Sequence, residues 1–122
     1  MAKTILIVED NALNMKLFND LLKSRDYVTL QSNDGSDVME IAKEQSPDLI
    51  IMDIQLPGRS GLDLTKDLKA DDDLKHIPIV AVTAFAMKGD EEKIREAGCD
   101  DYIAKPISIP IFLETMEKFL AE

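Results

Sequence analysis

The chain has 122 residues, of which 45% are hydrophobic and 31% charged, and this size and composition predict one globular domain over residues 1–122. Its net charge of −10 argues against nucleic acid as a partner, because binding to phosphates needs a basic face. No apolar run approaches the ~20 residues that span a bilayer, and no secretion signal precedes the first apolar run. We therefore expect a cytoplasmic protein without membrane insertion, and the single cysteine, Cys99, fits a reducing compartment.

In the first half of the chain, short apolar runs alternate with helical patterns. Residues 5–8 are apolar throughout, which is typical of a strand that is covered on both faces. Four-residue spacing then predicts a helix that begins at Asn11 or Ala12 and buries a stripe of Leu13, Leu17, Phe18, Leu21 and Leu22. The β-prone run 27–30 suits an edge strand, and a helix over about 35–45 buries Val38, Ile41 and Ala42. Residues 49–52 form the second fully apolar strand.

The second half continues the alternation. A helix over 62–69, an apolar strand over 79–82, a short strand over 102–104 and a helix over 109–120 are expected; the last helix buries Phe112, Met116, Phe119 and Leu120. The helix expected over 87–97 has only Met87, Ile94 and Ala97 to bury, so we expect it to shift most readily, with Gly98 as its C-terminal cap. Five strands alternating with five helices predict an α/β fold with a parallel, doubly wound sheet.

Polar side chains follow four of the five expected strands. Glu9 and Asp10 end the first strand, Asp53 the third, Thr83 the fourth and Lys105 the fifth. In open α/β sheets ligands bind beyond the carboxyl ends of the strands, so we expect these side chains to converge on one rim. The competing interpretation, that the acids only cap helices, is reasonable for Asp10 but gives no role to Thr83 or Lys105.

A carboxylate after an apolar strand is costly unless it has a partner, and neighbouring carboxylates add repulsion. A hard divalent cation removes both penalties, and oxygen ligands suit Mg²⁺, with Mn²⁺ as an alternative. We expect Asp10 and Asp53 as direct ligands, the backbone carbonyl of Gln55 as a third, and Glu9 as a ligand either directly or through water.

The same residues suit phosphoryl transfer. A carboxylate such as Asp53 can attack phosphorus, while the metal, the Lys105 ammonium and the Thr83 hydroxyl neutralise the phosphoryl oxygens. No glycine-rich phosphate loop follows the first strand, and one histidine, His76, cannot supply a Ser-His-Asp set. We interpret His76 as a surface residue, Cys99 as a small core residue and residues 71–73 as a solvated turn.

Glu9-Asp10, the segment Met-Asp-Ile-Gln-Leu-Pro-Gly-Arg-Ser-Gly at 52–61, Thr83-Ala84 and Lys105-Pro106 together resemble the receiver domain of bacterial two-component response regulators. The resemblance covers residues 3–120 and implies a flavodoxin-like (βα)5 fold with strand order 2-1-3-4-5. It implies Asp53 as phosphoacceptor, Glu9, Asp10 and the Gln55 carbonyl at Mg²⁺, Thr83 and Tyr102 as switch residues, and a cis Lys105–Pro106 peptide. Residues 83–92 and 71–74 resemble stand-alone cell-division response regulators of alphaproteobacteria in particular.

The resemblance implies a single-domain response regulator that is phosphorylated on Asp53 by a sensor histidine kinase, with sensor histidine kinases/phosphatases and downstream signalling proteins as its partners. Phosphorylation would switch the surface formed by helix 4, strand 5 and helix 5, which would then regulate partner proteins in cell division. We expect a monomer or weak dimer that is not an enzyme, beyond assisting its own phosphotransfer and dephosphorylation. One alternative is an Mg²⁺-dependent phosphohydrolase, although no second acid stands two residues after Asp53 to protonate a leaving group. The other is an unphosphorylated docking module, whose stability Mg²⁺ would leave unchanged.

Overall fold

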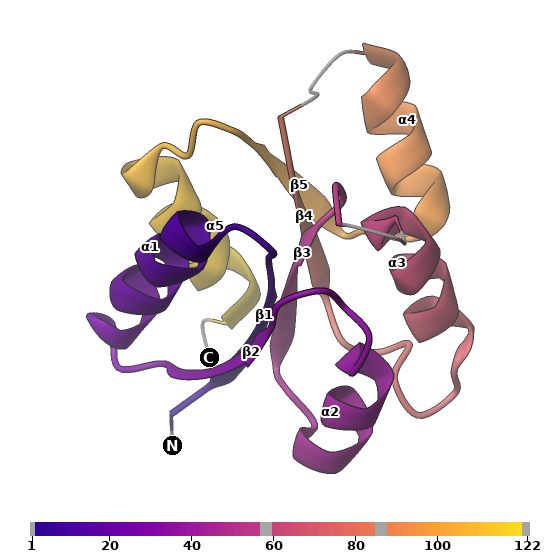
Figure 1. Ribbon diagram of the computed structural model, residues 1–122, viewed down its shortest axis with the longest axis horizontal. Helices are drawn as coiled ribbons and strands as arrows, with labels where there is room; N and C mark the ends of the chain where they lie inside the picture. The colour runs from indigo at the N-terminus through magenta and orange to yellow at the C-terminus, as the bar shows by residue number, and fades with distance from the viewer. Residues whose placement is uncertain (1, 57–59, 85–87, 121–122) are drawn as a thin grey trace.

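The computed structural model describes residues 2–56, 60–84 and 88–120, and strands and helices alternate along the chain (Figure 1). The elements in chain order are β1 (Thr4–Val8), α1 (Ala12–Lys23), β2 (Val28–Ser32), α2 (Val38–Gln45), β3 (Leu49–Asp53), α3 (Gly61–Ala70), β4 (Ile79–Thr83), α4 (Lys88–Ala97), β5 (Asp101–Ala104) and α5 (Ile109–Leu120). None of the helices in the described ranges combines the length and apolar character that a bilayer crossing requires.

The strands form one parallel sheet in the order β2-β1-β3-β4-β5, which confirms the predicted class and strand order. The three runs that are apolar throughout lie at the centre of the sheet, and the two weaker runs lie at its edges. This division follows from burial, because a central strand is covered on both faces whereas an edge strand keeps contact with water. All five strands end at the same rim because they are parallel.

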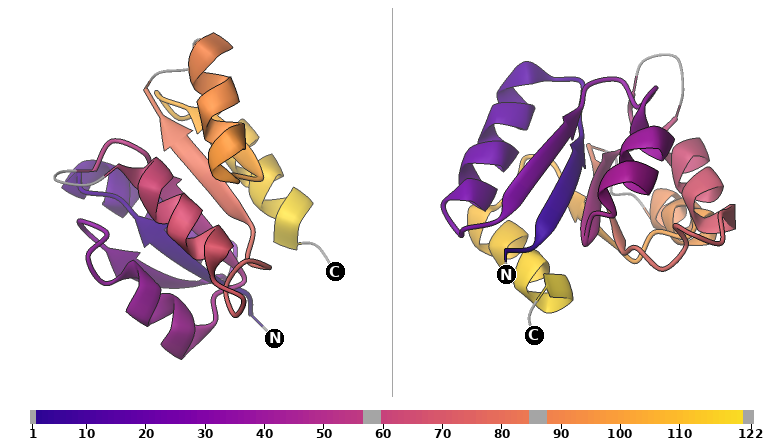
Figure 2. Two further views of the ribbon diagram at one scale, coloured as in Figure 1. Left: turned by 90° about the vertical axis from the view of Figure 1, so that its right-hand side faces the viewer. Right: turned by 90° about the horizontal axis from the view of Figure 1, so that it is seen from below.

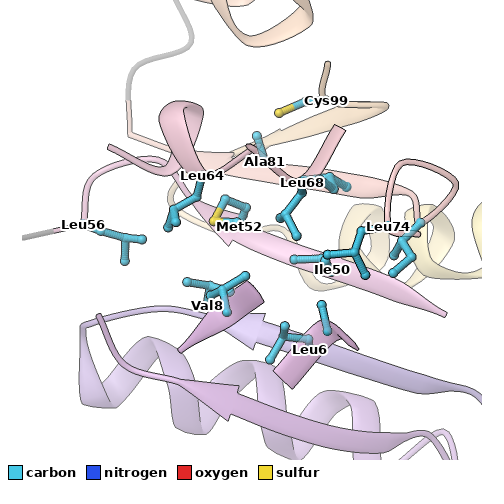
Figure 3. Packing of buried hydrophobic residues seen from close by; sticks show 14 of the residues in the cluster. Leu6, Val8, Ile50, Met52, Leu56, Leu64, Leu68, Leu74, Ala81 and Cys99 are labelled. Carbon is cyan, nitrogen blue, oxygen red and sulfur yellow. The ribbon is translucent and has the colours of Figure 1, made fainter. Parts of the chain in front are cut away.

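Helices cover both faces of the sheet. In Figure 1, α1 and α5 lie on the left of the sheet and α2, α3 and α4 on the right, and Figure 2 shows these layers from two further directions. Alternate residues of one strand point to opposite faces, so each strand contributes to two clusters. Figure 3 shows the cluster on the α3 side, where Val8, Ile50 and Met52 pack against Leu64 and Leu68.

The predicted apolar stripe of α1 is partly wrong. Leu13 is 79% exposed, and the side chains that the helix buries are Met15, Phe18 and Leu22. A strict four-residue step turns by 400°, so it drifts about 40° around the helix with each turn, whereas steps of three and four residues stay on one face. The Phe18 ring stacks on Phe112 of α5 with centroids 5.3 Å apart, which joins the two helices of this layer.

Other boundaries differ by a few residues. The predicted start of the second helix at about residue 35 is wrong: α2 begins at Val38, and Gly35 lies in the preceding loop with φ +82°. Ile41 and Phe119 are half-buried instead of fully buried, and Met87 lies outside the described residues. Gly98, with φ +106°, follows the last residue of α4 in the left-handed conformation expected of a helix cap.

The residues interpreted as structural behave accordingly. Cys99 is buried, and its Sγ lies 3.8 Å from the Thr65 hydroxyl. Burial raises the pKa of the Cys99 thiol, which disfavours the reactive thiolate. His76 is exposed. The turn at 71–73 is solvated at its last two residues, while Asp71 pairs with Lys43 at 3.1 Å.

Candidate phosphoryl-transfer site

The register of the central strands brings the acids together. Val8 of β1 lies opposite Met52 of β3, so Glu9 and Asp53 are the next residues of the two neighbouring strands. Glu9 is 1% exposed and Asp53 2% exposed, while Asp10 is exposed at the rim. One carboxylate oxygen from each of the three residues lies within 4.8 Å of the other two. The expected convergence of carboxylates is therefore present in the fold.

Lys105, the residue that follows β5, reaches the same place. Its Nζ lies 3.2 Å from Glu9 Oε1 and 3.5 Å from Asp53 Oδ2, and its side chain is 19% exposed. The Lys105 backbone N–H donates to the Thr83 carbonyl at 2.7 Å, which aligns the ends of β4 and β5. The Lys105–Pro106 peptide is cis, as the family resemblance implied.

The buried carboxyl groups of Glu9 and Asp53 shift each other's pKa in opposite directions. Burial, a hydrogen bond to Asp53 and the Asp53 charge raise the pKa of Glu9 to about 7, against the lowering effects of the Asn11 N–H and Lys105. Burial alone would also raise the pKa of Asp53, but hydrogen bonds from Glu9 and from the Gln55 N–H, together with Lys105, hold it below its ordinary value. In the metal-free protein Asp53 is thus the ionised partner, and Glu9 carries the shared proton below about pH 7.

One oxygen of this pair has no satisfactory hydrogen bond. Glu9 Oε1 is buried and, among the described residues, accepts no well-aligned hydrogen bond even though Lys105 is close. A buried acceptor left in this state is costly, and a cation bound between the carboxylates would relieve it. The donor set contains only oxygen, and two of its members are strongly buried, so these residues fit a hard divalent cation such as Mg²⁺.

Local structure explains why each acid is free for this role. The N-cap of α1 is Asn11, whose side chain accepts hydrogen bonds from the Leu13 and Asn14 N–H groups, so the alternative that Asp10 caps this helix is wrong. The Gln55 N–H donates to Asp53 Oδ1 at 2.9 Å, which fixes the orientation of that carboxylate at the strand end.

Gly61, at the start of α3, is a positioning residue that sequence reasoning missed. A β-carbon at this position would stand 2.7 Å from the Cα of Ile54 and closer still to the Asp53 carbonyl oxygen. The start of α3 therefore packs directly against the backbone of the central acid, and only glycine permits this approach. The glycine lies in the segment 52–61 that resembles the receiver family, but its close approach to Asp53 could not be inferred from the sequence.

The two predicted switch residues lie on the same face of the sheet. Ala81 of β4 pairs with Tyr102 of β5, and Thr83 pairs with Ala104, so these four side chains point the same way. Thr83 is fully buried at the rim, and Tyr102 is partly buried against the cluster beneath α4. Arg95 of α4, whose position gave no signal in the sequence, places its guanidinium carbon 5.9 Å from the centre of the Tyr102 ring.

Comparison with known proteins agrees with this arrangement. The family described as the response regulator receiver domain matches residues 5–117. The chain is 57% identical over 122 residues to the polar-differentiation response regulator DivK of Brucella anthropi, an alignment that covers 100% of this chain and 99% of that protein.

Solved structures give the same result. A response regulator from Chloroflexus aurantiacus is similar with a TM-score of 0.94 and 27% identity, and the match covers both chains fully. The receiver domain of a sensor histidine kinase from Pseudomonas aeruginosa, with a magnesium ion in its active-site cleft, has a TM-score of 0.90 and 32% identity over the whole of both chains. The receiver domain of Saccharomyces cerevisiae Ssk1, in complex with the phosphotransfer protein Ypd1, has a TM-score of 0.89 and 27% identity and covers 97% of this chain and 88% of that one.

Proposed function

The chain belongs to the response regulator receiver domain family, and we propose that it accepts a phosphoryl group on Asp53 from a sensor histidine kinase or a phosphotransfer protein. In this proposal residues 1–122 act as one receiver domain that signals by a change at its α4–β5–α5 surface. The observation that carries the proposal is the buried Asp53 carboxylate, held between Glu9, Asp10 and the Lys105 ammonium at the rim of the sheet.

The transfer uses Asp53 as the nucleophile. Its lowered pKa keeps the carboxylate ionised at neutral pH, so an oxygen can attack the phosphorus of a phosphohistidine donor. A phosphorus–oxygen bond to Asp53 forms while the donor's phosphorus–nitrogen bond breaks. The electron pair of the broken bond stays on the imidazole nitrogen, which takes up a proton from water. Later attack by water on the same phosphorus breaks its bond to the Asp53 oxygen, which releases inorganic phosphate and restores the carboxylate.

The remaining residues neutralise charge. The Lys105 ammonium, now 3.5 Å from Asp53 Oδ2, pairs with one phosphoryl oxygen, and the Thr83 hydroxyl donates to another. Asp10, Asp53, the Gln55 carbonyl and Glu9 would hold Mg²⁺, or Mn²⁺ in its place. A cation held there would supply positive charge that offsets the charge of the phosphoryl group. The ion in the related Pseudomonas aeruginosa domain and the unsatisfied Glu9 Oε1 support this assignment.

Phosphorylation is read out through Thr83 and Tyr102. The phosphoryl group adds about −2 of charge, which draws the Thr83 hydroxyl toward Asp53 and vacates space on the face that it shares with Tyr102. The Tyr102 ring then turns inward and α4 is repositioned, because the described part of α4 buries only Ile94 and Ala97.

Partners approach the rim along α1. Leu13 is 79% exposed in the first turn of that helix, three residues after Asp10, and offers an apolar contact for a donor protein. The complex of Ssk1 with Ypd1 supports recognition of a histidine phosphotransfer protein by a related domain. The 57% identity to DivK supports a role in polar differentiation and the cell cycle.

Mass measurement on the intact protein tests the proposal. With Mg²⁺ and a small phosphodonor such as acetyl phosphate, the wild type should gain the mass of one phosphoryl group, and this gain should be absent when EDTA replaces Mg²⁺ from the start of the reaction. Asp53→Asn should gain none, and Asp72→Asn, at an exposed acid of the 71–73 turn, should match the wild type. Equal labelling of Asp53→Asn would contradict the proposal. Release of many equivalents of phosphate per chain from a generic ester would favour a phosphohydrolase instead.

A further inference from the structure

Arg95 covers the ring of Tyr102 from the side of α4. The guanidinium carbon lies 5.9 Å from the ring centroid, within the range of a cation–π interaction. The Arg95 Nε also donates to Glu91 Oε1 at 3.3 Å, one helical turn earlier. The guanidinium is therefore held from two sides, by a carboxylate on its own helix and by an aromatic ring on the neighbouring strand.

The end of α4 next to Arg95 is fixed to the rest of the domain. Lys69 of α3 donates from Nζ to Asp100 Oδ2 at 3.0 Å and to the Ile77 carbonyl at 2.9 Å. A β-carbon at Gly98 would stand 2.9 Å from the Lys69 side chain, so the chain at the foot of α4 lies directly on that lysine. Arg95, three residues before Gly98, thus projects from the anchored end of the helix.

On the sheet side, the described residues of β4 and β5 between Tyr102 and Thr83 have small side chains. Ala81 is its partner on β4, and Ala104 lies two residues further along β5, next to Thr83. A ring that leaves its present position toward the rim passes over methyl groups. Such a movement breaks the contact with Arg95.

We propose that Arg95 is a positioning residue for Tyr102, whose contact with the ring sets how often the unphosphorylated domain adopts the switched surface. This inference rests on the proposed function and adds a regulatory residue to it. An exposed cation–π contact corresponds to a factor of about two to five in an equilibrium constant. Loss of the guanidinium should raise the ratio of switched to unswitched chains by that factor before any phosphoryl transfer.

The sequence allows a direct optical test. The chain has two tyrosines and no tryptophan, so Tyr27→Phe leaves Tyr102 as the dominant intrinsic fluorophore. In that background we would compare Arg95→Gln with Lys93→Gln, which removes the same charge from an exposed site of the same helix. Arg95→Lys and Glu91→Gln complete the series, and circular dichroism verifies that each variant is folded. The readout is quenching of Tyr102 emission by acrylamide, with and without acetyl phosphate and Mg²⁺.

In the unphosphorylated Arg95→Gln protein, acrylamide quenching of Tyr102 should move part of the way toward the value of the phosphorylated parent. The size of this change should correspond to a two- to fivefold rise in the ratio of switched to unswitched chains, and Lys93→Gln should show no such change. Glu91→Gln should shift less, and Arg95→Lys should restore most of the parent behaviour. If Arg95→Gln matches Lys93→Gln although the parent responds to phosphorylation, the inference is wrong and the proposed function stands. If the parent gains no phosphoryl mass, it is the proposed function that fails, and the two failures are therefore distinguishable.

Discussion

Replacement of Glu9 by glutamine should stabilise the metal-free protein strongly at pH 8 and by less than about 1 kcal/mol at pH 5. Glutamine has nearly the shape of a protonated glutamate and keeps a donor for the hydrogen bond to Asp53. At pH 5 the native wild type carries a proton on Glu9, while the unfolded chain, with an ordinary pKa of 4.5, has lost most of its own, so the two proteins differ by less than about 1 kcal/mol. At pH 8 the wild type holds a second buried negative charge beside Asp53, and the variant does not.

The magnitude follows from the pKa of Glu9, which rises from an ordinary 4.5 to about 7 on folding. Between these values the native state binds a proton that the unfolded chain has lost, so the free energy of unfolding falls as pH rises through this window. A difference of this size corresponds to about 3 kcal/mol, at about 1.4 kcal/mol for each factor of ten. Because Asp53 shares the interaction, we expect the variant to be more stable by about 2–3 kcal/mol at pH 8.

The assay is urea unfolding in EDTA, monitored by circular dichroism, at steps of half a pH unit from pH 5 to pH 8. The free energies of unfolding are compared where the two proteins have equal m-values, that is, equal dependence on urea concentration. The matched control is Glu44→Gln at an exposed position of α2, which should run parallel to the wild type at every pH. Excess Mg²⁺ should stabilise the wild type at pH 8 more than the variant. A Glu9→Gln curve parallel to the wild type, or lower at pH 8, would refute the reasoning.

Three further predictions concern the residues around Asp53. Lys105→Gln should slow labelling by a small phosphodonor about 10²-fold, because the variant loses one group that neutralises charge in the transition state, and Lys75→Gln should leave the rate unchanged. Equal labelling rates in the two variants would exclude Lys105 from the mechanism. Gly61→Ala should lower the free energy of unfolding by about 1–3 kcal/mol, measured in urea, because its β-carbon overlaps the Asp53 backbone; a neutral result would contradict the close approach. Leu13→Ser should slow phosphotransfer from a cognate kinase while labelling by acetyl phosphate stays unchanged, and an equal loss with both donors would place Leu13 in the chemistry.

Much of the architecture could be predicted because the buried strands of this chain are continuous runs of apolar residues. Runs of four or more apolar residues, as at 49–52, occur where helices cover a strand on both faces. Once the strands are parallel, their polar ends must meet at one rim, which is why Glu9, Asp53 and Lys105 could be placed together from the sequence. The fold and the candidate site thus depend on the same pattern.

The errors and omissions have a different origin. The prediction that Leu13 is buried is wrong because the apolar residues of α1 are compatible with more than one buried face of the helix. Packing against the sheet selects the face that contains Met15. The roles of Gly61 and Arg95 depend on contacts between segments distant in the chain. Such contacts depend on how the helices pack against the sheet, and no local sequence pattern indicates them.

The central claim is that the carboxylate of Asp53 forms the acyl phosphate. Borohydride reduces an acyl phosphate to the corresponding alcohol, so chain labelled with acetyl phosphate and Mg²⁺ can be reduced, digested and sequenced by mass spectrometry. We expect homoserine at position 53 and intact aspartate at position 10. Homoserine at position 10, or a reduced glutamate at position 9 with Asp53 unchanged, would contradict the account.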